Sequence, residues 1–283
     1  MQTLHCDMPL LSRGENKASL VLAHAYVPPY YAFAAPEANL VYRAFHDLSE
    51  DLSARLKAKA SAACLQDLRC TTLLREGTAS DLLDELRDAD LIVVGTSGAT
   101  GFEKAALGST AEAIFRSSKV PVLTVGPNCC CGVAAIGLNT VLYATDFSNG
   151  AAMALPYAVS ISSEHNANLV LLHVSPDQNT GFSFERTMAS IEPLDKLHKL
   201  MNENTAEFIE SDIDPNFKPT YLVAFGNPEK VIVEEAKNRK ADLIVMGAHG
   251  AGELVSLRTH FGGSTAYDVA VHADCPVLTI RTR

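Results

Sequence analysis

The stretch Ala89–Gly98, which reads ADLIVVGTSG, recurs as ADLIVMGAHG at Ala241–Gly250. In both places a run typical of a buried strand ends on a glycine, and a second glycine follows after two intervening residues. An apolar strand that ends in G-x-x-G is a common phosphate-binding position in a parallel α/β sheet. The chain therefore contains two candidate phosphate sites, or one site and one relic of a site.

The repetition extends beyond this strand, which indicates two copies of one unit. Further matches pair Leu20–Ala25 with Leu169–Val174, Gly77 with Gly226, and Val120–Val125 with Cys275–Ile280. The two copies thus follow each other in tandem over most of the chain.

The second copy alternates strand and helix patterns. Ser148 or Asn149 can cap its first helix, and Pro228 suits the first turn of a later one. Such alternation predicts parallel βαβ units with right-handed crossovers, and hence two tandem doubly wound α/β domains. The expected strands are 140–144, 168–174, 220–224, 242–246 and 277–281, and the expected helices after the first are 193–210 and 228–239.

The first copy has no counterpart of the segment 140–148, so it lacks an opening strand. We expect a truncated domain at 1–128, a linker at 129–137 and a complete domain at 138–283. Without its first strand, the first copy could close strands two and four together, fill the gap with another segment, or pack loosely. A start codon placed too late would give the same sequence. Cys129–Cys131 reads as part of the linker, with metal binding or redox sensing as the alternative.

The composition is that of an ordinary soluble protein. The formal net charge is -10 over 283 residues, which argues against nucleic acid or an anionic membrane as the main partner. Seven cysteines form no metal-ligand or disulfide pattern. We find no signal peptide and no apolar run long enough to span a membrane, and we expect a cytoplasmic protein.

By these residues the chain resembles the universal stress protein family in its tandem two-domain form. The segment Val141–Ser148, both ADLIV strands and both strands of the CPVL type carry the resemblance. The first copy also reproduces the ATP-binding signature of the family, in which nine residues separate G-x-x-G from G-S. The resemblance implies a five-stranded parallel sheet of order 3-2-1-4-5 in the complete domain. It also implies a pseudo-dimer within the chain, formed through the fifth strands, and leaves a further homodimer open.

The resemblance further implies an adenine-nucleotide site, for ATP or ADP with Mg²⁺. Glycines let the backbone approach a phosphate, and helix N-termini favour an anion. Asp146 matches the acidic residue near the adenosine, and Val174 matches the position whose backbone meets the base. The other expected nucleotide-binding residues are Gly247, His249, Gly250, Gly263, Ser264 and Thr265 in the second copy, and Gly95, Gly98, Gly108, Ser109 and Thr110 in the first.

The two candidate sites depart from the family pattern in complementary ways. The first copy keeps the glycine spacing but has no counterpart of Asp146. The second copy has Asp146, but twelve residues separate Gly250 from Gly263. Arg258 or His260 in this longer loop could reach the phosphates, although a solvated loop explains them equally well. We favour the second copy as the nucleotide site.

The expected function is stress response through nucleotide binding rather than turnover, because no nucleophile–base pair and no metal-binding acid cluster is visible. Slow ATP hydrolysis would be incidental. The alternative is a nucleotide-free interaction or chaperone-like module whose loops are structural only. An adenine-nucleotide hydrolase ranks lower, since the segment after the first strand lacks a glycine-rich pyrophosphate loop.

Overall fold

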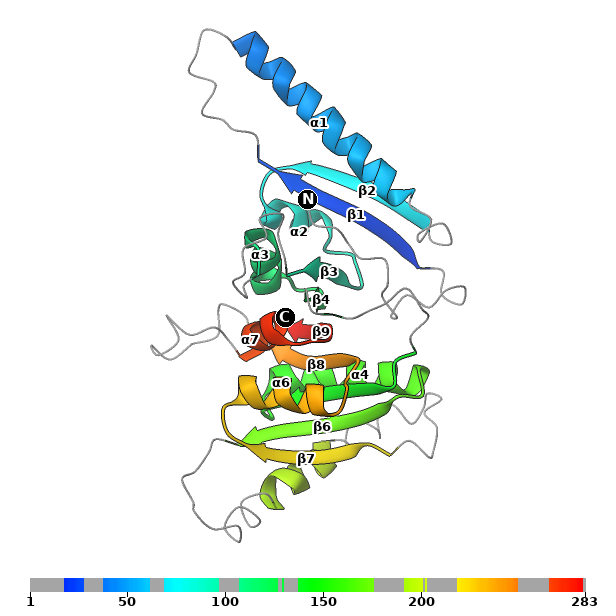
Figure 1. Ribbon diagram of the computed structural model, residues 1–283, viewed down its shortest axis with the longest axis vertical. Helices are drawn as coiled ribbons and strands as arrows, with labels where there is room; N and C mark the ends of the chain where they lie inside the picture. The colour runs from blue at the N-terminus through cyan, green and yellow to red at the C-terminus, as the bar shows by residue number, and fades with distance from the viewer. Residues whose placement is uncertain are drawn as a thin grey trace. The chain divides into compact units, whose positions relative to one another are not determined.

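The computed structural model describes residues 18–27, 38–61, 69–96, 107–126, 129, 137–175, 191–200, 202, 218–248 and 265–281 (Figure 1). These residues divide into two compact units, with the boundary between Asp88 and Ala89. Among the described helices, none has both the length and the apolar character needed to cross a membrane.

The first unit is a two-stranded parallel sheet covered by a long helix. Its strands are β1 (Ser19–Tyr26) and β2 (Arg69–Glu76), and its helices are α1 (Ala38–Ala60) and α2 (Ala79–Glu85). Leu22 of β1 and Leu56 of α1 are both buried and form the centre of a small apolar cluster, which Leu20, Ala60, Cys70 and Leu74 surround. This cluster holds α1 on the sheet.

Two glycines confirm that the copies share one local geometry. Gly77 follows β2 with φ +138°, and Gly226 follows β7 (Thr220–Phe225) with φ +135°. Side chains rarely adopt this backbone conformation, which glycine reaches without a steric penalty. Each glycine donates its N–H to the end of the neighbouring strand, at Tyr26 O (2.9 Å) and Ser175 O (3.0 Å) respectively.

The second unit is built on one seven-stranded sheet in the order β3-β4-β9-β8-β5-β6-β7. Besides β7, its strands are β3 (Ile92–Gly95), β4 (Val122–Val125), β5 (Thr140–Thr145), β6 (Asn168–Ser175), β8 (Leu243–Ala248) and β9 (Val277–Arg281). The strands of the second copy therefore lie in the order 3-2-1-4-5, as expected. Val141, Leu142 and Tyr143 are fully buried, which is typical of a central strand covered on both faces.

The fifth strands of the two copies join the sheet together. β4 and β9 pair antiparallel, with Leu123 opposite Leu278, whereas every other pair of neighbours in the sheet is parallel. Thr279 Oγ1 donates a hydrogen bond to Val122 O (3.2 Å), and the Arg281 guanidinium donates one to Phe115 O (2.6 Å). The expected contact between fifth strands thus forms within the chain.

The first copy is divided between the two sheets. The second and fourth strands expected for this copy are β1 and β3, and they do not pair with each other. Among the described residues, β1 pairs only with β2, and β3 pairs only with β4. The described strands of the first copy thus form two pairs. β1 and β2 make a short sheet of their own, and β3 and β4 belong to the sheet of the second copy.

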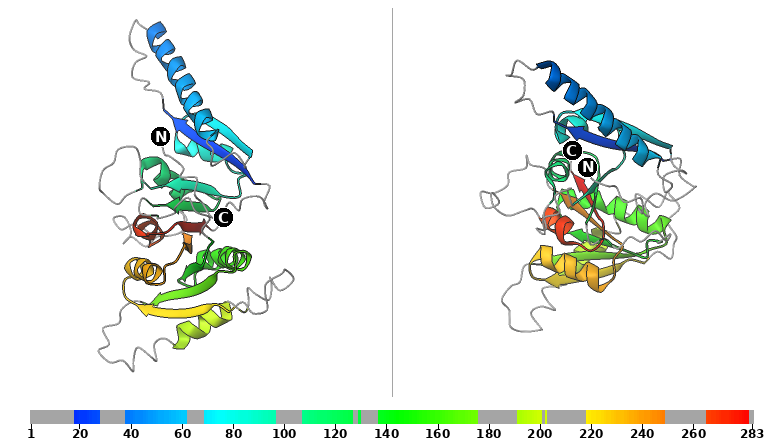
Figure 2. Two further views of the ribbon diagram at one scale, coloured as in Figure 1. Left: turned by 45° about the vertical axis from the view of Figure 1, so that its right-hand side comes forward. Right: turned by 45° about the horizontal axis from the view of Figure 1, so that its top comes forward.

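Helices cover both faces of the seven-stranded sheet. α4 (Asn149–Glu164) packs against β5 and β8 on one face, where Tyr143 OH donates to Ala151 O at 2.7 Å. α6 (Pro228–Asn238) and α7 (Thr265–His272) contact each other on the opposite face, as the left view of Figure 2 shows. α3 (Ser109–Ser117) follows β3, and residues 191–200 are also helical.

The Leu56→Ala substitution tests whether the first unit depends on its own core. Leu56 is only 4% exposed, so we expect a loss of about 2–4 kcal/mol in the stability of this unit. Leu48→Ala on the same helix is the matched control, because Leu48 is 39% exposed. Hydrogen exchange should show faster exchange of the β1 amides in the first variant alone. Equal acceleration in β5 and β6 would contradict independent unfolding of the two units.

Candidate functional site

Three of the predicted residues meet at the carboxyl edge of β6, β5 and β8. Asp146 follows β5 directly, Val174 lies near the end of β6 and Gly247 near the end of β8. The register pairs Thr145 with His173 and Ala144 with Met246, so the three residues occupy neighbouring positions. Strand order reverses at β5, and such a switch point is where open α/β sheets bind ligands.

The turn after β5 is fixed by side-chain hydrogen bonds. Phe147 N donates to Thr145 Oγ1 (3.0 Å), and Ser148 N donates to Asp146 Oδ1 (3.0 Å). Ser148 then caps α4, with its Oγ accepting from Ala151 N at 3.2 Å. Asp146 itself is exposed. Its carboxylate is therefore held in place by one oxygen while it faces solvent.

Phe147 adopts a backbone conformation that is unusual for a large side chain. Its φ is +62°, in the left-handed region. Its ring lies 4.4 Å from the His173 ring, tilted by 33°, and Lys196 Nζ lies 5.8 Å from the Phe147 ring centroid. His173 Nδ1 lies 2.9 Å from Thr145 O. These contacts connect the turn after β5 to the end of β6 and to the helix at 191–200.

Gly247 allows β8 to approach the start of α4. A Cβ at this position would lie 2.5 Å from Ala151 N and would also collide with the Gly150 backbone. No side chain fits there without a shift. The first turn of α4, with its amide groups and the positive end of the helix dipole, is consequently pressed against the strand that carries the glycine motif.

Burial also determines the protonation of the residue beneath this contact. Tyr143 is fully buried, and this burial, together with the nearby Asp146 charge, raises the pKa of its phenol to about 12, although a hydrogen bond with Thr145 opposes the shift. The phenol is therefore a neutral donor at physiological pH, consistent with its hydrogen bond to Ala151 O. It anchors α4 rather than contacting a ligand.

The phosphate side of the second copy is described only in part. Thr265 begins α7 and is half-buried. His249, Gly250, Gly263 and Ser264 lie outside the described residues, as do Arg258 and His260 of the longer loop.

The first copy presents part of its own motif at the opposite edge of the sheet. Gly95 ends β3, and Gly108 precedes α3, donating its N–H to Thr96 O at 3.2 Å. Ser109 and Thr110 are exposed in the first turn of α3. Because β4 runs antiparallel to β9, the carboxyl ends of β3 and β4 point away from those of β8 and β9. Gly98 lies outside the described residues.

The structure does not assemble an adenosine side for the first copy within this sheet. Ala25, the counterpart of Val174, belongs to β1 in the first unit, whereas Gly95 belongs to the second unit. The second copy has the residues of both sides in one unit.

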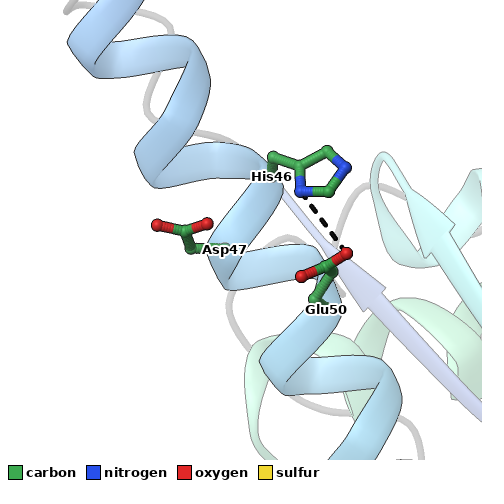
Figure 3. A group of neighbouring side chains, drawn as sticks. All are labelled: His46, Asp47 and Glu50. Atoms are coloured by element: carbon green, nitrogen blue, oxygen red, sulfur yellow. Dashed lines mark ion pairs between the residues drawn. The ribbon is translucent and has the colours of Figure 1, made fainter.

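His46, Asp47 and Glu50 on α1 form a separate group of ionisable side chains, shown in Figure 3. Their ligand atoms lie within 4.8 Å of one another, and His46 Nδ1 lies 3.6 Å from Glu50 Oε1. All three are exposed, and they belong to a single helix, where pairs four residues apart commonly interact. The geometry requires no ion.

Sequence reasoning missed Phe147, Gly150, His173 and Lys196 as parts of this edge. Phe147 could have attracted attention because it follows Asp146 directly. The positive φ and the contacts across strands have no signal in the sequence.

The Gly247→Ala substitution tests the close approach of β8 and α4. The added methyl group collides with backbone that cannot rotate away, so we expect a loss of about 1–3 kcal/mol in stability, measured by urea unfolding. Gly95→Ala is the matched control at the equivalent position of the first copy, where a Cβ would meet no atom within 4 Å. Equal effects of the two substitutions would contradict the contact.

Comparison with known proteins identifies relatives over most of the chain. The profile described as the universal stress protein family matches residues 11–126 and 137–281. A universal stress protein of Mycolicibacterium smegmatis is 29% identical over 213 residues, which cover 75% of this chain and 69% of that protein. One from Thermus aquaticus is 32% identical over 146 residues, covering 50% of this chain and 98% of its own.

A solved structure shares the fold. The crystal structure of a universal stress protein from Archaeoglobus fulgidus has a TM-score of 0.61 and 21% sequence identity, covering 94% of this chain and 89% of that one. At this identity the similarity concerns the fold alone.

Proposed function

The chain belongs to the universal stress protein family, and on this premise we propose that it binds an adenine nucleotide at the carboxyl edge of β6, β5 and β8. The observation that carries the proposal is the convergence of Asp146, Val174 and Gly247 at one edge of one sheet. Each of these residues also matches the nucleotide-binding pattern of the family.

The adenosine side of the proposed site rests on Asp146 and Val174. Asp146 Oδ1 accepts from Ser148 N, and the exposed carboxylate retains further acceptor positions for the ribose hydroxyl groups. The last pair between β5 and β6 is Thr145 with His173, so Val174 and Ser175 extend beyond the end of β5. The Val174 backbone pairs with Ala224 of β7 and has no β5 partner on its other side, which is where a base would enter.

The phosphate side of the proposed site rests on backbone and helix ends. The approach of β8 to α4 at Gly247, and the start of α7 at Thr265, bring two helix N-termini toward the ends of the central strands. Amide groups at helix N-termini favour phosphate, and ATP or ADP would carry Mg²⁺ with it. The net charge of -10 does not oppose this, because backbone amides supply the binding groups.

The arrangement favours binding over turnover. Ser148 Oγ is engaged in capping α4, and His173 Nδ1 faces a backbone carbonyl, so these two residues do not form a nucleophile–base pair. We therefore propose a cytoplasmic stress-response protein that acts through its nucleotide-dependent state and its partners, with any ATP hydrolysis slow and incidental.

Asp146→Asn tests the proposed site without removing the turn. The amide oxygen can still accept from Ser148 N, but the charge is lost, so we expect affinity for Mg-ATP to fall roughly tenfold or more in calorimetric titration. Asp274→Asn is the control, since this carboxylate precedes β9 at the other edge of the sheet and lies 3.3 Å from Lys237 Nζ. Unchanged affinity in Asp146→Asn would contradict the assignment. A wild-type chain that binds no nucleotide would favour the interaction module instead.

A further inference from the structure

His173 is held at the edge of the proposed base position by two contacts. It pairs with Thr145 across β5 and β6, directly before Val174. Its ring packs against Phe147, whose positive φ costs about 1–3 kcal/mol and must be stabilised by its surroundings. Backbone strain of this kind clusters at ligand-binding sites, where the surrounding contacts hold it in place.

The hydrogen bond to Thr145 determines which nitrogen of His173 carries the proton. Nδ1 lies 2.9 Å from Thr145 O, and a carbonyl oxygen can only accept. Nδ1 must therefore carry hydrogen. In the neutral imidazole Nε2 then has a lone pair and is an acceptor.

Nε2 lies on the side of the ring directed away from the Thr145 carbonyl. The described residues give this nitrogen no hydrogen-bond partner, and His173 is half-buried. A partly buried acceptor is stabilised when a donor from water or a ligand reaches it. With the proton on Nδ1, the group that would complete the site is thus a hydrogen-bond donor.

We propose that His173 is a specificity-determining residue whose Nε2 accepts a hydrogen bond from the exocyclic amino group of the base. This inference rests on the proposed function. Adenine presents an amine there, whereas hypoxanthine and guanine present a carbonyl oxygen at the same ring position. Two acceptors cannot pair, so the site selects 6-amino purines over 6-oxo purines.

The experiment compares affinities for Mg-ATP and Mg-ITP, which differ at this ring position. His173→Asn retains a nitrogen that can donate to Thr145 O but has no counterpart of Nε2. We expect the wild-type chain to prefer ATP, and the preference to fall roughly three- to tenfold in the variant, through weaker binding of ATP with little change for ITP. Near-ultraviolet circular dichroism checks that the fold is retained.

His272→Asn is the matched control. His272 Nδ1 lies 2.8 Å from Asp268 O, so it makes the same type of contact, but it is exposed near the end of α7. The His272→Asn variant should prefer ATP over ITP to the same degree as the wild-type chain.

Three results would overturn the inference. One is an unchanged preference for ATP in the folded His173→Asn variant. Another is an equal loss of affinity for ATP and ITP, which would mean that Nε2 contacts the ribose or another protein group. Either result leaves the proposed function intact if Asp146→Asn still weakens binding. Absence of nucleotide binding by the wild-type chain would instead reject both proposals.

Discussion

The antiparallel pairing of β4 with β9 determines where both candidate sites lie. It brings β3, β4 and α3 of the first copy into the sheet of the second copy. It also reverses the direction of the strands at that point, so the two glycine motifs emerge at opposite edges.

The central strand β5 is the second feature that determines the arrangement of the candidate site in the second copy. β5 is buried on both faces and pairs with β6 and β8, which carry Val174 and Gly247. β5 thereby brings these two residues to neighbouring positions at one edge of the sheet. In the first copy the corresponding strands, β1 and β3, belong to different sheets.

Much of this arrangement could be predicted from the sequence, because the signals are local. Alternating strand and helix patterns predicted the succession of elements in the second copy, whereas the order of its sheet came from the family resemblance. Ser148 and Pro228 marked the helix starts that the structure contains. The expected helix at 193–210 is described only at 191–200 and 202, and the expected strand at 277–281 agrees fully.

The parts that could not be predicted depend on residues distant in the sequence. The collision that keeps position 247 free of a side chain involves Gly150, nearly a hundred residues earlier. The contact of Phe147 with His173 requires both the register of β5 with β6 and a positive φ, and no residue pattern encodes that φ. Hydrophobic periodicity specifies elements, whereas such contacts arise only when the elements pack.

The pairing of β4 with β9 has one further consequence. Because both strands belong to one chain, their association is intramolecular, at an effective concentration of the order of millimolar. A contact between separate subunits would weaken on dilution and would respond to the amount of protein in the cell. Here the contact is independent of abundance, so a change in expression level alters the number of assembled units and not the fraction assembled.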